Sequence, residues 1–511
     1  MGIQTLEFQH VTFHYPDQSI DVFSDLDLVL STGWTAVIGA NGGGKSTLLM
    51  LASGIEEPLA GRVLRPASAV YVSQRTDDPP PTYDHFAYAW DALACKLHGQ
   101  LAIGRDYLER WETLSHGERK RAQIGWALHS ECDLLCIDEP TNHLDGEAMA
   151  MVVGALGLFR GIGLLVSHDL ATLDALCTTT LIISSPLVQK ISCPPSQALE
   201  EVASRRLASE AAYRSFTKET RRIEGEKRRR ASIAGEVDRR NTKRHIDRKD
   251  RDAKVRVDAY RVSGGDKRAG TLSRQLDGRL ERARAAQSSL AQVRHTTAAL
   301  DVTKEGGGIT ITGISHPAKT LLALPAGSIA VAPLRRLHHP PLVLGNTDRV
   351  GIRGANGIGK CTLLASLIAC LQTTTVRFWY LAQELGAEES RAAYQEFSAL
   401  EGERKGRIVS ALVRMGSSAD LFLSSALPSP GEMRKLLIAW ALEDEYSLMI
   451  LDEPTNHLDL PSRRALAGQL QGFSGALLLV SHDRSFLEGI CSSWWDLAWA
   501  DGHGDCILTI K

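Results

Sequence analysis

The chain contains the segment Leu134-Leu135-Cys136-Ile137-Asp138-Glu139-Pro140-Thr141-Asn142-His143-Leu144-Asp145 and, further on, its near copy Leu448-Met449-Ile450-Leu451-Asp452-Glu453-Pro454-Thr455-Asn456-His457-Leu458-Asp459. The apolar start of each copy is typical of a buried strand, and the Asp-Glu pair follows where a parallel sheet presents its ligands. In this position the first carboxylate can hold a metal ion, and the second can order a water molecule.

Three further motifs repeat in step with this segment. The glycine-rich loop recurs at an offset of 315 (360 − 45), and the other two motifs recur at an offset of 314 (429 − 115 and 482 − 168). The pairs are Gly39-Ala40-Asn41-Gly42-Gly43-Gly44-Lys45-Ser46 with Gly354-Ala355-Asn356-Gly357-Ile358-Gly359-Lys360-Cys361, Leu114-Ser115-His116-Gly117-Glu118 with Pro428-Ser429-Pro430-Gly431-Glu432, and Val166-Ser167-His168-Asp169 with Val480-Ser481-His482-Asp483. Because order and spacing are kept, the chain consists of two copies of one nucleotide-binding unit.

The first glycine-rich loop lies between a short apolar run, residues 35–38, and a helical pattern that continues through Leu48. Strand, loop and helix in this order are typical of a phosphate-binding loop. The backbone N–H groups and the helix N-terminus form an anion cradle, Lys45 adds a charge for the outer phosphates, and Ser46 offers an oxygen to magnesium. The alternative is a glycine turn without a ligand, and the motifs downstream argue against it.

Polar residues at other predicted strand and helix ends complete a candidate site in each copy. Gln74 and Gln383 each follow a short apolar run, and His168 follows another. Ser115 is placed as the N-cap of an amphipathic helix, whose dipole favours contact with a phosphate. Each residue has a simpler alternative interpretation: polar surface for the glutamines, a helix cap alone for Ser115, and a hydrogen-bonded core histidine for His168.

The bulk composition limits the class of protein. A length of 511 residues with 43% hydrophobic residues allows several globular domains with buried cores. The nine cysteines include no Cys-x-x-Cys pair, which disfavours a disulfide framework or zinc site and indicates a reducing compartment. No apolar run approaches the roughly 18 to 20 residues that span a bilayer, and the N-terminus lacks the basic start of a signal peptide. We therefore expect a soluble, cytoplasmic protein.

Positive charge is concentrated between the two copies. From Arg214 to Arg284 the chain has 24 Lys or Arg and 12 Asp or Glu, a net charge of +12, so the rest of the chain carries −14 (−2 − 12). Helix-forming residues at about 196–240 and 271–293 predict a helical hairpin without an aliphatic core between its arms. A solvated charged face is the alternative to a binding surface. The charge excess favours a phosphate backbone as the partner.

The hairpin tip, residues 241–270, is the predicted contact with nucleic acid. The candidate RNA-binding residues are Lys243, Arg244, Arg248 and Lys249.

The repeated loops, the two Ser-x-Gly-Glu signatures and the two Asp-Glu-Pro-Thr-Asn-His-Leu-Asp runs resemble the ATP-binding cassette superfamily. The Thr-Asn-His-Leu-Asp ending, the tandem copies, the absence of a membrane span and the charged hairpin resemble its ABC-F subfamily in particular. The resemblance implies an α/β fold with two P-loop ATP-binding cassette domains joined by a long α-helical hairpin linker. We place cassette 1 at residues 1–198, the linker at 199–300 and cassette 2 at 301–511.

The resemblance also implies that the cassettes of one monomer pair within the chain and close head to tail over two ATP molecules with Mg2+. The predicted nucleotide-binding residues are Tyr15, Gly39, Ala40, Asn41, Gly42, Gly43, Gly44, Lys45, Ser46 and Thr47 in cassette 1, and Gly354, Ala355, Asn356, Gly357, Ile358, Gly359, Lys360, Cys361 and Thr362 in cassette 2. Across the interface, Ser429 and Gly431 would serve the ATP held by Lys45. Ser115 and Gly117 would serve the ATP held by Lys360.

The chemical roles follow from the same resemblance. The predicted metal-binding residues are Ser46, Gln74 and Asp138 in cassette 1, and Gln383 and Asp452 in cassette 2. Glu139 and Glu453 would polarise the attacking water, and His168 and His482 would sense the γ-phosphate. Asp145 and Asp459 would couple the two sites, and Tyr15 is placed like the aromatic residue that stacks on adenine.

Cassette 2 departs from the family pattern in three places. Cys361 stands where a hydroxyl would bind magnesium, and a soft thiol is a poor ligand for a hard cation. His316 stands in place of Tyr15, and residues 324–348, with their Pro and His pairs, predict an irregular lead-in. These departures suggest the hypothesis of two unequal ATP sites, although Glu453 indicates that hydrolysis is retained in cassette 2.

The resemblance implies an ATPase that binds the ribosome and sets its hairpin against tRNA or ribosomal RNA, as a translation factor or an antibiotic-resistance protein. One alternative is the ATPase subunit of a membrane transporter, which would leave the basic hairpin unexplained. A second is a DNA-directed ABC-F ATPase, which the hairpin permits.

Overall fold

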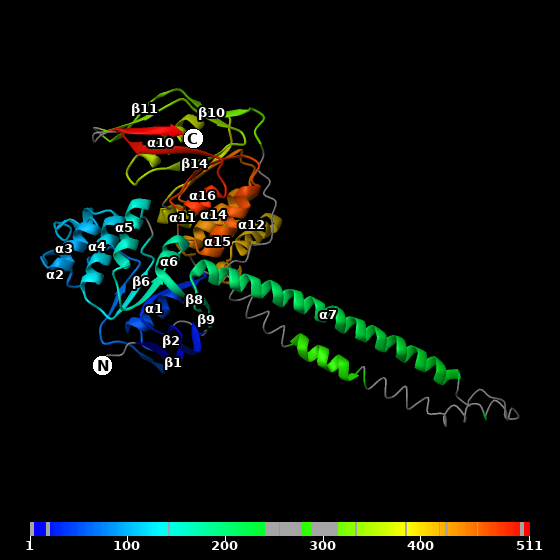
Figure 1. Cartoon of the computed structure of the whole chain (residues 1–511). Coiled ribbons are helices and arrows are strands. Elements are labelled where there is room, and N and C mark those ends of the chain that lie inside the picture. The colour runs from blue at the N-terminus through cyan, green and yellow to red at the C-terminus, as the bar shows by residue number, and fades with distance from the viewer. Residues whose placement is uncertain are drawn as a thin grey trace. The chain divides into compact units, whose positions relative to one another are not determined.

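The computed structural model describes most of the chain. The described residues are 5–16, 21–141, 144–240, 255, 275, 277–288, 315–332, 335–383, 386–417, 419–424, 428–456, 458–500 and 505–511. The chain divides into two compact units, Met1–Ala198 with Val302–Lys511, and Leu199–Asp301. The first unit holds both predicted cassettes, and the second corresponds to the segment between them (Figure 1).

A six-stranded sheet forms the centre of cassette 1. In spatial order its strands are β5 (Ala69–Val72), β6 (Leu134–Asp138), β7 (Ile162–Val166), β3 (Gly33–Gly39), β8 (Cys177–Ser184) and β9 (Leu187–Ile191). The strands are parallel except for β9, which pairs antiparallel with β8. Every residue of β6 and β7 is buried, as expected for central parallel strands that are covered on both faces.

Cassette 1 also contains a smaller antiparallel sheet with the strand order β2-β1-β4. Its strands are β1 (Leu6–Phe13), β2 (Phe23–Leu30) and β4 (Ala60–Leu64). Phe8 and Phe23 from this sheet join Leu48 and Leu164 in one buried apolar cluster. The cluster fixes the small sheet against the helix that follows the glycine loop.

The helices of cassette 1 follow the strands that position the motifs. They are α1 (Lys45–Ser53), α2 (Tyr83–Ala87), α3 (Ala92–Gln100), the 3-10 helix η1 (Trp111–Thr113), α4 (His116–His129), α5 (Gly146–Leu156) and α6 (Leu170–Leu176). Helix α1 directly follows the glycine loop, and α4 directly follows Ser115. The predictions of a helix after the loop and of a helix capped by Ser115 are therefore confirmed.

Cassette 2 repeats the central strand order and adds two strands at one edge. The order is β11 (Gly327–Ala332), β12 (Arg335–His339), β19 (Cys506–Ile510), β18 (Ser493–Trp499), β14 (Arg349–Arg353), β17 (Ala476–Val480), β16 (Leu448–Asp452) and β15 (Phe378–Leu381). A separate two-stranded sheet pairs β10 (Thr320–Leu324) with β13 (Leu342–Gly345). The prediction of an irregular lead-in at residues 324–348 is therefore wrong.

The regular strands in this lead-in have a physical explanation. β11 and β12 pair antiparallel, and β12 also pairs with β19, which gives the hairpin a place at the sheet edge. The Pro340-Pro341 pair lies between β12 and β13, where missing N–H groups cost no ladder hydrogen bond.

The sheet of cassette 2 has a core on each face. Leu448 and Ile450 belong to one buried cluster, whereas the alternate residues Met449 and Leu451 belong to another. This alternation is the side-chain period of a strand. The covering helices are α10 (Lys360–Leu371), α11 (Ala387–Ala399), α12 (Gly402–Arg414), α13 (Ala419–Ser424), α14 (Pro430–Glu443), α15 (Leu460–Gly472) and α16 (Arg484–Glu488).

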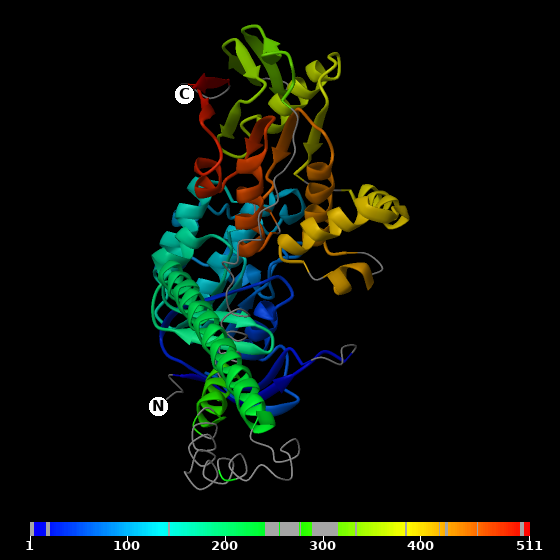
Figure 2. The ribbon, with the colours of Figure 1, turned by 90° about the vertical axis from the view of Figure 1, so that its right-hand side faces the viewer.

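The second unit is dominated by helix α7 (Pro195–Arg240), and a shorter helical stretch at 277–288 runs beside it (Figure 2). Glu224 pairs with Arg284 at 2.6 Å, and Thr217 Oγ1 accepts a hydrogen bond from Gln287 Nε2 at 3.1 Å. Ile223 packs with Leu280 and Ala283 in a small buried cluster, so the prediction of a hairpin without an aliphatic core is wrong. A hairpin with two packed arms is confirmed over these residues.

No helix in the described part of the chain is long and apolar enough to cross a membrane.

Candidate functional site

The glycine loop of cassette 1 is built by the end of β3 and the start of α1. Gly44 is the N-cap of α1 with φ of 94°, and a Cβ there would lie 2.7 Å from Val22 Cγ1, so glycine is required. Lys45 is buried, and its Nζ donates to Gly39 O at 3.0 Å and to Ala40 O at 3.1 Å. The ammonium group thus spans the loop, at the helix N-terminus that favours anions.

The two carboxylates of cassette 1 stand at the end of β6. Asp138 is buried and accepts a hydrogen bond from the Tyr71 hydroxyl at 3.3 Å. Glu139 is 5% exposed and has a φ of 49°, a conformation rare for a residue with a side chain. This backbone geometry turns the glutamate out of the strand register and next to the aspartate.

Burial raises the pKa of Glu139 to about 7, although Lys45 opposes the shift. His168 Nε2 lies 3.2 Å from Glu139 Oε1, and burial lowers the pKa of His168 well below its usual range, so the imidazole is neutral. Apart from His168, the oxygens of Glu139 have no hydrogen-bond partner among the residues that the structure describes. A carboxylate in this state can accept a proton from a water molecule.

The remaining predicted residues of cassette 1 lie around this centre. Ser46 at the start of α1 and Gln74, two residues beyond β5, are exposed. Thr47 is buried, and its Oγ1 lies 3.0 Å from the Tyr15 hydroxyl. The Tyr15 ring meets Phe13 edge to face at 5.1 Å, so two contacts fix its orientation.

Cassette 2 builds the same loop. Gly359 is the N-cap of α10 with φ of 108°, and Lys360 Nζ donates to Gly354 O at 2.7 Å and to Ala355 O at 3.2 Å. Glu453 is 4% exposed with φ of 48°, and burial raises its pKa to about 7. The backbone and the buried glutamate are therefore duplicated closely.

The histidine of cassette 2 is oriented differently. His482 Nε2 lies 2.9 Å from Asn356 Oδ1 and 3.5 Å from Glu453 Oε1, so its closer partner is the glycine loop. Burial, together with Lys360, lowers the pKa of His482 to about 4. The corresponding His168 makes its closer contact with the glutamate.

Cys361 changes the group of predicted metal-binding residues in the second site. Its Sγ lies 3.5 Å from Asp452 Oδ2 and 4.0 Å from Gln383 Oε1, so the thiol occupies the place between the two predicted metal-binding residues. Burial, reinforced by Asp452, raises the pKa of Cys361 to about 11, which keeps the sulfur protonated near neutral pH. A protonated thiol is a poor ligand for magnesium.

Both signature segments begin helices. The Ser115 hydroxyl caps α4 and forms a capping box with Glu118, and Ser429 caps α14 by accepting from Glu432 N at 3.3 Å. Gly117 and Gly431 lie in the first turns of these helices. Each signature therefore presents a helix N-terminus, as predicted.

Two buried cations that the motifs did not predict hold the signature helices. Lys120 Nζ donates to Ser73 O at 2.6 Å, and burial lowers the pKa of Lys120 to about 8. The corresponding Arg434 donates to the carbonyl oxygens of Gln383 and Glu453. Their shared offset of 314 (434 − 120) was the available signal.

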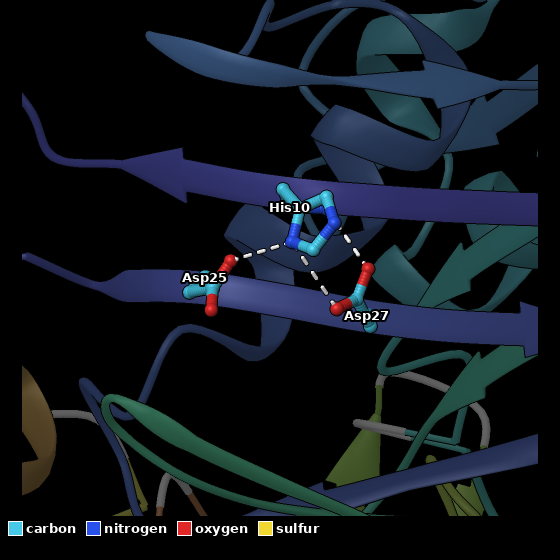
Figure 3. Close-up of side chains that lie close together, drawn as sticks. All are labelled: His10, Asp25 and Asp27. Carbon is cyan, nitrogen blue, oxygen red and sulfur yellow. Dashed lines mark hydrogen bonds and ion pairs between the residues drawn. The ribbon is translucent and has the colours of Figure 1, made fainter.

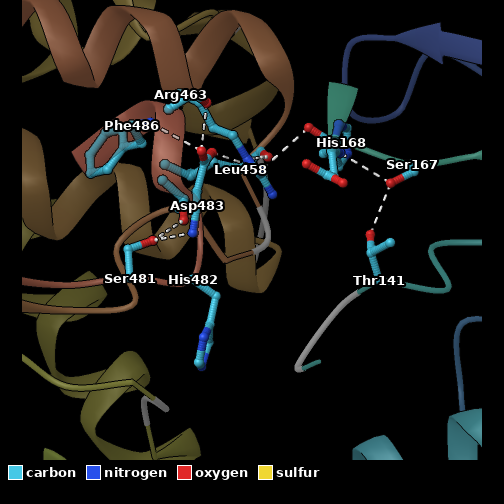
Figure 4. A network of polar contacts seen from close by, with 12 residues as sticks. Thr141, Ser167, His168, Leu458, Arg463, Ser481, His482, Asp483 and Phe486 are labelled. Atoms are coloured by element: carbon cyan, nitrogen blue, oxygen red, sulfur yellow. Dashed lines mark hydrogen bonds and ion pairs between the residues drawn. The ribbon is translucent and has the colours of Figure 1, made fainter. Parts of the chain in front are cut away.

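One contact between two hydroxyl groups supports the catalytic end of each cassette. Thr141 Oγ1 lies 2.9 Å from Ser167 Oγ (Figure 4). Thr455 Oγ1 lies 3.2 Å from Ser481 Oγ. These contacts join the loop after each Asp-Glu pair to the strand end before each histidine. Asn142, His143 and His457 of the same segments lie outside the described residues.

Reciprocal aspartates join the two cassettes. Asp459 Oδ2 accepts a hydrogen bond from Asn41 N at 2.8 Å, and Asp145 Oδ2 accepts one from Asn356 N at 3.2 Å. The other oxygen of each aspartate caps its own helix, at Ser462 N and Ala148 N. Each glycine loop is thus connected to the helix that follows the opposite Asp-Glu segment.

Two further groups of polar residues contain candidate binding residues. Lys243, Arg244, Arg248 and Lys249, the candidate RNA-binding residues, are outside the described residues. His10, Asp25 and Asp27 meet on the small sheet of cassette 1, where His10 Nδ1 lies 2.8 Å from Asp25 Oδ1 (Figure 3). All three side chains are exposed, and their mutual ion pairing accounts for the arrangement.

Comparison with known proteins agrees with the repeat. The family model described as ABC transporter matches residues 23–142 and 337–456. The chain is 30% identical over 561 residues to the tylosin resistance ATP-binding protein TlrC of Streptomyces fradiae, across 96% of this chain and 97% of that protein. It is 28% identical over 504 residues to the ribosome protection protein VmlR of Bacillus subtilis (strain 168), across 95% of this chain and 85% of VmlR.

A solved structure shares the fold over nearly the whole chain. It contains the archaeal ribosome recycling factor aABCE1 in complex with the ribosomal stalk protein aP1, and the match has a TM-score of 0.61 with 16% identity. The alignment covers 98% of this chain and 89% of the matched chain. At this level of identity the likeness shows the tandem fold alone.

Proposed function

The chain belongs to the ABC-F subfamily of ATP-binding cassette proteins and is a tandem P-loop ATPase; from this premise we propose that it binds the ribosome and uses ATP-driven closure to place its basic linker near tRNA or ribosomal RNA. The observation that carries the proposal is a segment of net charge +12 inserted between two linked nucleotide sites. The names of the relatives VmlR and TlrC, a ribosome protection protein and a tylosin resistance protein, support ribosome binding. The proposed role is antibiotic resistance by ribosome protection or a role as a translation factor.

In the proposed cycle, residues 1–198 and 301–511 form the cassettes of a monomer, and residues 199–300 form the linker. ATP with Mg2+ supplies the transferred phosphoryl group. In cassette 1, Lys45 and the loop amides hold the phosphates, and Ser46, Gln74 and Asp138 supply the oxygen ligands that suit Mg2+. The carboxylate of Glu139 would orient a water molecule and accept its proton, and His168, 3.2 Å from Glu139 Oε1, would steady that carboxylate.

The second site fits the same nucleotide, but we expect it to bind Mg2+ more weakly. Lys360 and the glycine loop match cassette 1, whereas Cys361 replaces the hard hydroxyl oxygen. Asp452 and Gln383 remain as oxygen ligands. We therefore expect cassette 2 to hold ATP and to hydrolyse it more slowly than cassette 1, which is the unequal-site hypothesis.

Ribosome co-sedimentation tests the main proposal. The variant Glu139→Gln with Glu453→Gln would be centrifuged through sucrose with bacterial ribosomes, with ATP and without it. A matched variant would also carry Lys243, Arg244, Arg248 and Lys249 changed to Ala. ATP-dependent pelleting that is lost with the four linker charges is the expected result, because phosphate contacts supply most of the affinity for RNA.

Failure to pellet with ATP and without it would overturn the ribosome proposal. Liposomes and branched DNA, run as parallel samples, test the transporter-subunit and DNA-directed alternatives. Pelleting that survives loss of the four charges would overturn the assigned role of the linker tip.

A further inference from the structure

Arg463 of cassette 2 reaches the catalytic end of cassette 1. It lies in the first turn of α15, with its side chain 13% exposed. Its Nη1 donates to His168 O at 3.3 Å, across a sequence separation of 295 residues. Figure 4 shows the guanidinium between the α15 segment and His168, with His482 turned away from it.

The guanidinium is fixed by its own cassette. Arg463 Nε donates to Leu458 O at 3.0 Å, and Nη1 lies 3.5 Å from Asp483 Oδ2. Asp483 is itself fixed, because its Oδ1 caps α16 by accepting from Phe486 N at 3.0 Å. Because the guanidinium is planar, these two partners fix its orientation, and in this orientation Nη1 points to the carbonyl oxygen of His168.

His168 is the residue that touches the buried glutamate. Its Nε2 lies 3.2 Å from Glu139 Oε1, and its backbone follows Ser167, which holds Thr141. A donor at the His168 carbonyl therefore fixes the backbone from which the imidazole projects. The positive charge of Arg463 also acts on Glu139 and opposes the rise in the pKa of Glu139 caused by burial.

Cassette 1 has no arginine at the position equivalent to Arg463. That position is Met149 (463 − 314), whose side chain has no hydrogen-bond donor. Lys435 of cassette 2 pairs with Glu432 of its own cassette at 2.9 Å and also acts electrostatically on Lys45 and His168, whereas its counterpart Arg121 donates to Leu101 O at 2.6 Å within cassette 1.

Cassette 1 contributes a negative charge, that of Asp145, to the second site. The charges that act on His482 are those of Lys360 and Asp145, and Asp145 is the one that belongs to cassette 1. Each site therefore receives a carboxylate from the opposite cassette, Asp459 at the first site and Asp145 at the second, and Arg463 adds a cation at the first site.

We propose that Arg463 is a positioning residue that acts across the cassette interface on the first ATP site only. It couples α15 and the Asp483 cap of cassette 2 to His168, and through His168 to Glu139. Through this contact, hydrolysis in cassette 1 depends on the position of α15 of cassette 2, and hydrolysis in cassette 2 receives no equivalent contact from Met149. The inference rests on the proposed catalytic roles of Glu139 and His168 and is independent of ribosome binding.

The test measures each site separately in the full chain without ribosomes. A Glu453→Gln background leaves site 1 active, and a Glu139→Gln background leaves site 2 active. In the first background, Arg463→Met should lower the single-turnover rate about tenfold, the loss expected for one hydrogen bond from a charged donor. The KM for ATP should stay within about twofold, since the contact is made to the protein and not to the nucleotide.

Three comparisons separate positioning from general structural damage. Arg464→Met, a change at the exposed neighbouring arginine, should leave both rates unchanged. Arg463→Lys, which keeps a donor and the charge, should restore at least part of the lost rate at site 1. Arg463→Met in the Glu139→Gln background should leave the rate of site 2 within about twofold.

Equal slowing of both sites by Arg463→Met, a rise in KM with an unchanged rate, or no restoration by Arg463→Lys would overturn the proposal. Because the Lys variant keeps the cation, it also tests the idea if Arg463→Met fails to fold. Failure of the underlying site assignment would be visible separately, because Glu139→Gln would then leave site 1 turnover intact in the Glu453→Gln background.

Discussion

The two ATP sites share a buried Asp-Glu pair but differ in what surrounds it. Glu139 and Glu453 have nearly the same φ, the same burial and the same pKa of about 7. Around them, Ser46 is exchanged for Cys361, and the paired histidines choose different partners. A repeated motif therefore fixes the backbone and the burial, while single substitutions and contacts across the interface decide the chemistry of each site.

The difference between the histidines illustrates this division. His168 lies under Arg463 and contacts Glu139, whereas His482 contacts Asn356 of its own glycine loop. Both histidines follow the same Val-Ser sequence and precede the same helix-capping Asp. The four-residue motif Val-Ser-His-Asp is identical in the two cassettes, so the motif does not determine which partner the histidine contacts.

The largest expected effect is the unequal loss of turnover on removing each glutamate. Glu139→Gln should lower steady-state phosphate release by roughly 10²-fold or more, the usual range for loss of a general base. Glu453→Gln should lower it by less than about twofold, because the Cys361 site contributes little to total turnover. Equal single-turnover rates in the two variants would end the unequal-site hypothesis.

The next effect concerns stability, where the two cassettes should behave alike. The pKa of Glu139 rises from 4.5 to about 7 on folding, so the folded chain retains a proton that the unfolded chain releases between these pH values. Stability from this group is present below pH 4.5 and is lost as the pH rises through about 7. Glu139→Gln should therefore raise the Tm at pH 8. The corresponding gain in the free energy of unfolding is at most roughly 3 kcal/mol.

The Tm gain should shrink towards pH 5, where the carboxyl group is already neutral in the folded chain. Glu453→Gln should show the same direction and the same pH window, since the pKa of Glu453 also rises from 4.5 to about 7. Thermal melts without nucleotide at pH 5 and pH 8 check both variants. A lower Tm at pH 8 for either variant would contradict the buried-carboxyl explanation.

A reciprocal exchange of the loop residues sharpens the comparison further. Cys361→Ser in the Glu139→Gln background should raise the rate of site 2 by about tenfold, equivalent to about 1.4 kcal/mol, because it restores a hard oxygen ligand. Ser46→Cys in the Glu453→Gln background should lower the rate of site 1 by a similar factor. The Mg2+ concentration for half-maximal rate should shift in opposite directions, and unchanged Mg2+ dependence would argue against a ligand role.

The smallest expected effect lies at the aromatic positions. Tyr15 is fixed by Thr47 and Phe13, whereas His316 Nδ1 accepts a hydrogen bond from Ala318 N at 3.2 Å. Tyr15→Leu should raise the Kd of site 1 for an ATP analogue about fivefold, as expected for loss of about 1 kcal/mol of stacking. His316→Leu should change the Kd of site 2 by less, in titrations with the other site disabled at its loop lysine. A larger effect at His316 would reverse this part of the comparison.

Several features could be predicted because they depend on local sequence. The strands before each Asp-Glu pair, the helices after each glycine loop and the Ser115 and Ser429 caps all form at or within a few residues of the predicted places. Short apolar runs and capping residues act through neighbouring backbone groups, so a single sequence contains them. The prediction for residues 324–348 was wrong because one of their strands, β12, pairs with β19, which lies more than a hundred residues away in the sequence.

The sequence alone determined that this chain carries two phosphate-binding loops, two buried Asp-Glu pairs and a basic segment between them, since these follow from motifs, spacing and charge. It also identified Cys361 as the exception. Only the tertiary structure decided that His168 and His482 face different partners, that the glutamate pKa values rise together, and that Arg463 reaches His168. Those properties depend on burial and on contacts between residues hundreds of positions apart, and neither is encoded in the local pattern at either end of the contact.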